Sequence, residues 1–265
     1  MMNAKKIVEY IVSWLEKYIK KSKSNGFIIG ISGGIDSSVT SMLVAMTNYP
    51  TLILEMPILE KNKNLLSNKH VDFLQSRFLN VHHLKKDLSS LYSSFCHIVE
   101  DHSSSNLSLA NLKSRIRMVT LYYYANRNNY LVVGTGNKVE DFGVGFFTKY
   151  GDGGVDIHPI ADLNKSEIRF IAKELNILDG IQKAKPTDGL WEDQRSDEDQ
   201  LEATYEELEW AMKITEKKKK INCDEFEGRE YDIMKRYQIL HKKNRHKIIP
   251  IPICHIPSSI KKKIE

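Results

Sequence analysis

The sequence predicts an α/β protein in which a doubly wound parallel sheet is flanked by helices, with a helical extension toward the C-terminus. Short apolar runs without alternation, such as residues 27–31, are typical of strands buried on both faces of a parallel sheet. Segments with apolar residues at helical spacing separate these runs. Strands and helices that alternate in this way predict a doubly wound sheet, and the length of 265 residues fits a single domain over residues 1–265.

The first half of the chain supplies most of the predicted sheet. An amphipathic helix comes first, and its apolar positions share one face: Ile7, Tyr10, Ile11, Trp14, Leu15 and Tyr18. The Ser-Asn-Gly sequence at 24–26 ends it. We expect strands at 27–31, 51–54, 81–84 and 130–133. Helices between the first three strands are marked by Val39, Met42, Leu43 and Met46, and then by Val71, Leu74 and Phe78.

Helices dominate the remaining predicted elements. A long helix before the fourth strand has apolar residues at steps of three and four, a seam long enough to pack against another helix: Leu109, Leu112, Ile116, Val119 and Tyr123. After Gly180 the chain becomes more charged. Two further helical faces are predicted there, one with Leu201, Tyr205, Leu208 and Met212, and one with Phe226, Ile233, Tyr237 and Leu240.

Composition and charge exclude several classes of function. No segment approaches the roughly 20 apolar residues that cross a bilayer, and residues 1–25 lack the apolar centre of a secretory signal, so we expect a cytoplasmic protein without a membrane partner. The net charge of +5 is too small to require nucleic acid. Cys96, Cys223 and Cys254 stand far apart, which favours buried thiols over disulfides or a zinc site.

The sharpest motif is the sequence GISGGIDSS at 30–38, between a predicted strand and the following helix. Its glycines allow a tight turn, and the amides at the helix start, with the hydroxyls of Ser32, Ser37 and Ser38, can surround a phosphate or pyrophosphate. The GxxxxGK[ST] loop of common NTPases is absent. Because a carboxylate repels phosphates unless a cation intervenes, Asp36 implies bound Mg²⁺.

Residues 32–38 resemble the SGGxDS pyrophosphate loop of the ATP pyrophosphatases, which adenylate an acyl group or a base. Two later stretches, GTGNKVE at 134–140 and GFFTKYGDGGVD at 145–156, resemble the NAD synthetases. The resemblance covers about residues 5–250. It implies a Rossmann-like fold of the adenine nucleotide alpha hydrolase type. The segment after Lys185-Pro186 departs from the family pattern, with Asp188 and the acidic residues Asp197, Glu198 and Asp199.

The resemblance also implies site residues. For ATP these are Gly30, Ile31, Ser32, Gly33, Gly34, Ile35, Asp36, Ser37, Thr135, Lys165 and Thr187. For deamido-NAD they are Arg115, Lys149, Asp156, His246 and Lys247, the last two being expected past the final helix, in a segment that closes over the substrate. Asp36 and Glu140 would share the Mg²⁺ ion.

The implied activity is that of an ammonia-dependent NAD synthetase, which acts as a homodimer. The carboxylate of deamido-NAD attacks the α-phosphate of ATP, pyrophosphate leaves, and ammonia displaces AMP from the acyl-adenylate. Free ammonia is expected as the nitrogen source because the chain begins at the first synthetase helix, without an amidase domain. Two alternatives are a tRNA-thiolating enzyme of the same superfamily, suggested by the basic residues near 242–247, and a non-catalytic adenine-nucleotide sensor.

Overall fold

A computed structural model describes residues 2–59, 65–100, 107–191, 193, 195–218 and 221–261. These residues form one parallel sheet with the strand order β3-β2-β1-β4. The strands are β1 (Gly26–Gly30), β2 (Thr51–Glu55), β3 (Val81–Lys85) and β4 (Tyr130–Val132). Phe27 pairs with Thr51 on one side of β1, and Gly26 pairs with Tyr130 on the other. The predicted parallel sheet and its four strands are therefore confirmed.

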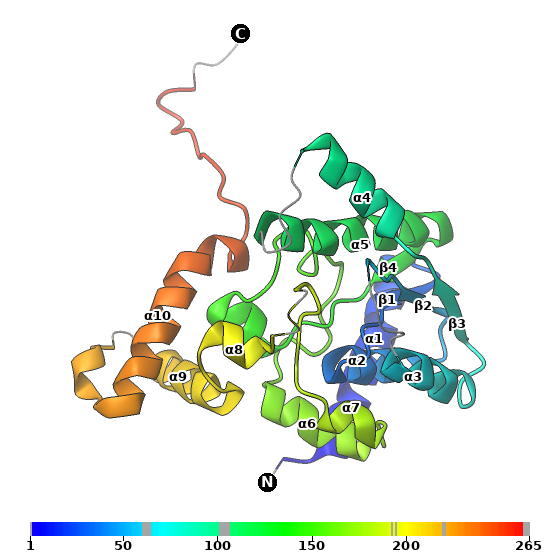
Figure 1. The fold of residues 1–265 in the computed structure, drawn as a ribbon, viewed down its shortest axis with the longest axis horizontal. Coiled ribbons are helices and arrows are strands. Elements are labelled where there is room, and N and C mark those ends of the chain that lie inside the picture. The colour runs from blue at the N-terminus through cyan, green and yellow to red at the C-terminus, as the bar shows by residue number, and fades with distance from the viewer. Residues whose placement is uncertain are drawn as a thin grey trace.

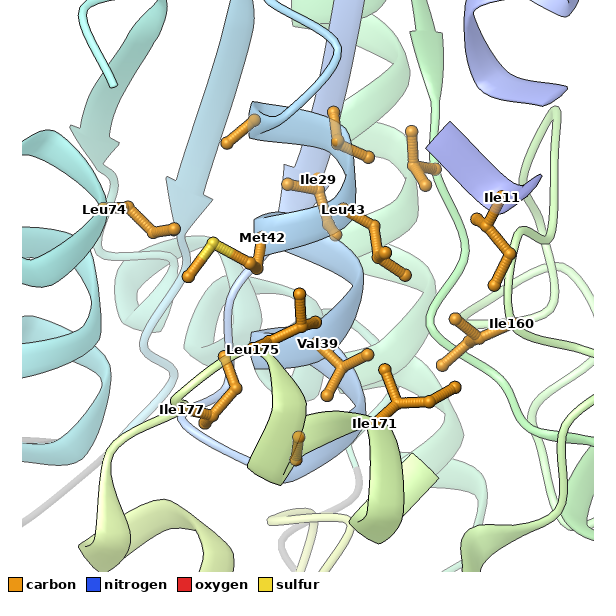
Figure 2. Close-up of a cluster of buried hydrophobic side chains, with 14 of the residues drawn as sticks. Ile11, Ile29, Val39, Met42, Leu43, Leu74, Ile160, Ile171, Leu175 and Ile177 are labelled. Atoms are coloured by element: carbon orange, nitrogen blue, oxygen red, sulfur yellow. The ribbon is translucent and has the colours of Figure 1, made fainter. Parts of the chain in front are cut away.

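Helices cover both faces of the sheet. Successive residues of β1 therefore point to two different cores. Phe27 and Ile29 contribute to a core with helices α1 (Ala4–Ser22), α2 (Ile35–Ala45) and α6 (Lys165–Glu174). Figure 2 shows Val39, Met42 and Leu43 of α2 between Ile29 and the residues Ile171 and Leu175. Helices α3 (Leu65–Gln75) and α7 (Asp179–Lys183) border this core.

The opposite face belongs to a second core. Ile28 packs there with residues of α4 (Ser89–Ile98) and α5 (Leu107–Asn128). Figure 1 shows α5 on the side of the sheet opposite α1, α2 and α3, with α4 outside it. Helices on both faces confirm the doubly wound arrangement.

A third core lies in a helical unit beside the sheet (Figure 1). It combines a π-helix, η1 (Lys138–Val144), with α8 (Asp197–Leu201), α9 (Tyr205–Lys217), the short 3₁₀ helix η2 (Cys223–Glu225) and α10 (Gly228–Ile248). The unit meets the sheet through η1, which follows β4 directly along the chain. This connection brings the helical unit next to the carboxyl ends of the strands.

Several details differ from the sequence-based expectations. In α1 the buried stripe contains Val8, Ile11 and Leu15, whereas Tyr10 is exposed. The α5 seam is divided, because Leu109 and Ile116 are buried in the second core while Val119 and Tyr123 face solvent.

Three further corrections concern the second half of the chain and the cysteines. Leu201 does not share a helix with Tyr205, because Glu202 adopts a left-handed conformation and ends α8. Phe226 precedes α10, which begins at Gly228. All three cysteines are free, but none is fully buried: Cys96 and Cys223 are half-buried and Cys254 is exposed. None of the helices that the structure describes combines the length and apolar character needed to traverse a bilayer.

Candidate functional site

The loop between β1 and α2 has the conformation of an anion-binding turn. Gly33 has a φ of 82°, a region that L side chains rarely adopt. The N-cap of α2 is Gly34, which offers no side-chain cap, so the leading amides of the helix remain for an anion. The Ser37 and Ser38 hydroxyls donate to the Gly34 carbonyl at 3.1 and 2.8 Å. Ser38 is fully buried, so its predicted contact with phosphate is replaced by a role inside the loop.

A charge cluster, made of Asp36, Glu140 and Lys165, lies at this loop. The Lys165 ammonium is 2.6 Å from Asp36 Oδ2 and 3.0 Å from Glu140 Oε1. The three residues come from α2, η1 and α6, which meet where the chain leaves the sheet. The Asn137 amide also donates to Asp36 Oδ2, at 3.4 Å. The two carboxylates predicted as metal ligands are therefore brought together, with a buried cation between them.

Two buried side chains extend the charge cluster into the helical unit. The Tyr205 hydroxyl lies 2.5 Å from Glu140 Oε1 and 3.1 Å from Asp197 Oδ2. Its single proton serves one acceptor at a time. When it is donated to Glu140, a protonated Asp197 can donate to the Tyr205 oxygen. Asp197, Tyr205 and Glu140 thus form a continuous polar chain behind the site.

The electrostatics of the charge cluster separate its two carboxylates. Burial raises the pKa of Asp36 above its usual value despite Lys165, and Glu140 adds repulsion. Burial also acts on Glu140, but Lys165 and the Tyr205 hydroxyl outweigh it and lower the pKa of Glu140. Burial opposes the charge on Lys165, yet the two carboxylates raise the pKa of this ammonium. Glu140 therefore keeps its charge readily, whereas a further cation would stabilise the charged form of Asp36.

Burial, followed by repulsion from Glu140, raises the pKa of Asp197 to about 7. Asp197 Oδ1 and Asp36 Oδ1 are both buried without a hydrogen-bond partner among the described residues. Unpartnered buried oxygens of this kind call for a ligand or a proton. The Asp36 oxygen lies in the first turn of α2, next to the amides offered to an anion, so the loop and the charge cluster share one site.

Four of the five residues predicted to contact deamido-NAD also lie together. The Arg115 guanidinium donates to the Lys149 carbonyl at 3.4 Å, and Lys149 Nζ donates to the His246 carbonyl at 2.6 Å. Lys247 Nζ donates to the carbonyls of Gly145 and Phe147 at 2.7 and 2.8 Å. His246 and Lys247 lie in the last turn of α10 and not beyond it, which corrects their expected place.

The other predicted residues are held elsewhere. The Asp156 carboxylate accepts from the Val132 amide at 2.8 Å and from the Tyr122 hydroxyl at 3.0 Å, so it fixes the end of β4. Thr135 is half-buried, three residues beyond β4. The exposed Thr187 hydroxyl donates to the Arg195 carbonyl at 3.1 Å, which engages it within its own loop.

The chain is similar to known proteins over most of its length. The family model of NAD synthase matches residues 7–250. The chain belongs to the NAD synthase family. The NH(3)-dependent NAD(+) synthetase of Sulfurisphaera tokodaii is 33% identical over 94% of this chain and 88% of the relative. That of Saccharolobus solfataricus is 35% identical over 94% and 89%.

Two solved structures share the fold closely. NMN synthetase from Francisella tularensis has a TM-score of 0.81 and 28% identity, covering 97% of this chain and all of that one. The NH3-dependent NAD synthetase of Campylobacter jejuni has a TM-score of 0.77 and 27% identity over 96% and 100%. Both likenesses extend over the sheet and the helical unit, so the α/β architecture predicted from the sequence is confirmed for a member of the NAD synthase family.

Sequence reasoning missed three residues of the site in this NAD synthase family member. Asn137, Tyr205 and Asp197 all contact the charge cluster or its extension. Tyr205 resembles an ordinary core residue, since it follows the helical spacing of Leu208 and Met212. The only available signal was the acidic sequence at 197–199, which also caps α8.

Proposed function

We propose that this protein is an ammonia-dependent NAD synthetase, a ligase that forms a C–N bond. The nicotinate carboxylate of deamido-NAD attacks the α-phosphate of ATP, and pyrophosphate leaves. Ammonia then attacks the activated acyl carbon, AMP leaves, and the nitrogen loses its extra proton to give the amide. The observation that carries the proposal is that the phosphate loop and the Asp36–Lys165–Glu140 charge cluster lie together. The relatives of this chain are named NH(3)-dependent NAD(+) synthetases, which supports the same activity.

In this proposal the loop holds the pyrophosphate portion of ATP. The amides of residues 30–37 receive phosphate oxygens, and Lys165 turns from the carboxylates toward the negative charge of the leaving group. Thr135 and Thr187 are assigned to ATP through the family resemblance, and Thr187 must first release the Arg195 carbonyl. These groups align the reactants and stabilise developing charge, so no covalent nucleophile is required.

The residues present fit Mg²⁺. Asp36 and Glu140 are hard oxygen ligands facing one ammonium, and Asp36 Oδ1 has no partner among the described residues. Within those residues no three carboxylate, imidazole or thiol groups converge, which suits an ion that takes one or two carboxylates and completes its shell with phosphate oxygens and water. When bound, Mg²⁺ would neutralise phosphate charge and favour departure of pyrophosphate.

Deamido-NAD is assigned to the neighbouring basic group of Arg115, Lys149, His246 and Lys247. Burial lowers the pKa of Lys247, whose ammonium donates to two backbone carbonyls. A pyrophosphate bridge would replace these carbonyls as the partner of Lys247. Asp156, whose carboxylate accepts from the Val132 amide, is assigned to deamido-NAD through the family resemblance.

We further propose a homodimer of single-domain subunits in the cytoplasm. The exposed Val119 and Tyr123 of α5 offer an apolar contact surface close to Arg115. Ile116 is buried within its own subunit, so it is unsuitable as an interface probe, and Val119→Glu is the cleaner change. Three free thiols fit a reducing compartment. A fully active Val119→Glu monomer at micromolar concentration would contradict a dimer that the reaction needs.

One experiment tests the reaction. The protein is incubated with ATP, Mg²⁺, deamido-NAD and ¹⁵N-ammonium, or with glutamine labelled at its amide, and the products are separated by mass. We expect equal amounts of NAD, AMP and pyrophosphate, with label from ammonium. Efficient transfer from glutamine would contradict the nitrogen source, and the absence of pyrophosphate would favour a nucleotide sensor.

A second candidate substrate is the mononucleotide, favoured by the likeness to the Francisella NMN synthetase. In the same experiment, nicotinate mononucleotide is tested in place of deamido-NAD. The proposal predicts a higher kcat/KM for deamido-NAD, since the basic group at Arg115 and Lys247 can contact a pyrophosphate bridge that the mononucleotide lacks. A preference for the mononucleotide would reassign the substrate while leaving the adenylation chemistry unchanged.

A further inference from the structure

A basic pocket between α6 and α7 contains none of the residues assigned to deamido-NAD. It has a volume of about 750 Å³ and is bounded by α6, α7 and the start of α2, and we call it the α6–α7 pocket. Its lining includes three cations, Arg169, Lys173 and Lys183, and one carboxylate, Asp179. Figure 1 shows α6 and α7 beside α2, whereas the last turn of α10, which carries His246, lies toward α5.

The pocket begins at the phosphate loop. Ile35, the first residue of α2, lines the pocket and follows Gly34, the N-cap of that helix. The Ile35 side chain belongs to the same core as Ile171 of α6 and Ile181 of α7. The amides that are offered to an anion at the start of α2 and the α6–α7 pocket are therefore neighbours.

The cations of α6 form a row that starts in the charge cluster. Lys165, Arg169 and Lys173 follow the i, i+4, i+8 spacing that places side chains one after another along a helix surface. Exposure rises along this cation row, because Lys165 is buried, Arg169 is half-buried and Lys173 is exposed. Eight residues of an α-helix rise roughly 12 Å. The cation row therefore carries positive charge from the buried site to the surface.

The ring of Tyr205 connects the first two members of the cation row. The Lys165 ammonium lies 4.6 Å from the centroid of this ring, and the Arg169 guanidinium lies 5.9 Å from it. Because both cations lie near the face of one aromatic ring, Arg169 adjoins the charge cluster directly. An anion held by Lys165 therefore has a second cation within one turn of the helix.

Two carboxylates reduce the positive charge of the pocket only weakly. Glu206 Oε1 is 2.9 Å from the Arg169 guanidinium, and Asp179 Oδ2 is 3.3 Å from Lys183 Nζ. The carboxylate side chains are 62% and 84% exposed, and exposed ion pairs contribute about 1 kcal/mol or less. A multiply charged anion can therefore replace these carboxylates, since it brings more negative charge than either of them.

We propose that the α6–α7 pocket binds the pyrophosphate that leaves the phosphate loop, and that the cation row is its route to solvent. During adenylation the bond between the α-phosphorus of ATP and the bridging oxygen breaks, and pyrophosphate keeps the electron pair. The anion then passes from Lys165 to Arg169 and on to Lys173 and Lys183, so a positive charge faces it at each position. The origin of the anion rests on the proposed function, whereas the affinity of the pocket for it does not.

Binding of inorganic pyrophosphate tests the pocket. The full chain is saturated with Mg²⁺ and α,β-methylene-ATP, which fills the loop and cannot release pyrophosphate, and inorganic pyrophosphate is then titrated in a calorimeter. We expect one pyrophosphate per chain. Lys173→Glu with Lys183→Glu should weaken this binding at least tenfold, because two cations become carboxylates. No binding, or an apparent affinity that falls in proportion to the analogue concentration, would overturn the proposal, since pyrophosphate would then have no site outside the loop.

Lys213→Glu with Lys217→Glu is the matched control. Both lysines are exposed on α9, and neither lines the pocket, so this variant makes the same change in net charge elsewhere. It should bind pyrophosphate within twofold of the wild type. Equal weakening in the two double variants would overturn the proposal, because binding would then depend on net charge alone. Tighter binding of ADP than of pyrophosphate would also overturn it, because the pocket would then be a nucleotide site.

A rapid-mixing measurement follows the route during the reaction. Adenylation is read after quenching in acid, and free pyrophosphate is read by inorganic pyrophosphatase coupled to a fluorescent phosphate sensor. In Lys173→Glu with Lys183→Glu, we expect release to slow at least fivefold while the adenylation rate stays within twofold of the wild type. Release at the wild-type rate would contradict the route. A wild type that forms no adenylate would refute the proposed function, whereas the calorimetric result would still decide whether the pocket binds the anion.

Discussion

The phosphate loop and the charge cluster occupy one site but are built in opposite ways. The loop joins β1 to α2, and its serines bond to residues no more than five positions away. In the charge cluster, Lys165 meets Asp36 across 129 positions and Tyr205 meets Glu140 across 65. The loop is therefore set by local backbone chemistry, whereas the charge cluster exists only when the sheet, η1, α6 and the helical unit have assembled.

This difference has a consequence for function. A loop fixed by its own residues can offer amides to phosphate without help from the rest of the chain. The charge cluster instead reports whether the helical unit is docked, because Glu140 and Tyr205 come from it. Adenylation requires both, so we expect changes in the charge cluster to affect folding and catalysis together, and changes in the loop to affect mainly ATP affinity, with a smaller effect on stability.

The largest expected effect comes from Lys165→Met. Removing the ammonium leaves the buried Asp36 and Glu140 facing each other, and breaking a buried ion pair in this way costs about 3–5 kcal/mol of unfolding free energy. Urea denaturation measures the loss. Because two unpaired carboxylates attract a divalent cation, millimolar Mg²⁺ should restore part of the stability of this variant.

Lys138→Met is the control for this prediction. Its ammonium pairs with Glu216 and Asp162 near the surface of the helical unit, where such pairs contribute about 1 kcal/mol or less. If Lys165→Met were no more destabilised than Lys138→Met, the charge cluster would not hold the helical unit to the sheet.

Tyr205→Phe separates the positioning of Glu140 from its charge. The phenyl ring still fills its buried place, but Glu140 loses the hydroxyl that orients it. Mutating a residue that hydrogen-bonds to a metal ligand typically lowers metal affinity or activity 10–100-fold. We expect the Mg²⁺ concentration for half-maximal pyrophosphate release to rise about tenfold or more. Tyr237→Phe, another buried tyrosine of the same helical unit, is the control and should behave as wild type.

The pH dependence of stability tests Asp197. Its pKa of about 7 in the folded protein exceeds the usual aspartate value of about 3.9, so the folded state binds more protons between these values and stability falls as pH rises toward 7. Asp197→Asn abolishes that contribution. Between pH 5 and 8 the wild type should lose on the order of 2 kcal/mol relative to Asp197→Asn in urea unfolding. Parallel pH profiles would show that Asp197 stays ionised when buried.

The sequence predicted best the features that are determined by residues adjacent in the chain. Residues 27–31 identified β1, and the glycines of the loop with Asp36 identified the anion site, because the relevant signals are adjacent in the chain. Glu140 was predicted through the family resemblance. Its contacts depend on a π-helix at Lys138–Val144, whose irregular turn has no recognisable apolar period.

Other features depend on tertiary structure that periodicity does not reveal. Val119 and Ile116 both fit the helical seam, but the packing of α5 buries only Ile116. His246 and Lys247 were expected past the final helix, yet α10 continues to Ile248, and the first residue to leave the helical conformation is Ile249, which precedes Pro250. Tyr205 was predicted only as an apolar position of a helix, because the partners of its hydroxyl, Glu140 and Asp197, lie in other elements.

The smallest expected effect belongs to the loop. Gly33→Ala places a side chain at a φ of 82°, which costs about 1–2 kcal/mol in local conformation. We expect the KM for ATP to rise up to tenfold with the KM for deamido-NAD little changed, while the unfolding free energy in urea falls by about these 1–2 kcal/mol. Gly228→Ala, at a φ of 55° with open space around it, imposes similar strain away from ATP and serves as the control. Equal rises for both substrates would mean that the loop is not locally set.

Metal binding to the charge cluster is the most direct test of the proposed site. Mn²⁺, which replaces Mg²⁺ and is visible by electron paramagnetic resonance, is titrated into the protein with a non-hydrolysable ATP analogue, comparing wild type with Asp36→Asn and Glu140→Gln. Asp162→Asn, a fully exposed carboxylate, is the control. The account predicts one analogue-dependent Mn²⁺ per subunit in wild type and Asp162→Asn, with affinity reduced at least tenfold in both site variants. Unchanged Mn²⁺ affinity in Asp36→Asn and Glu140→Gln would contradict it.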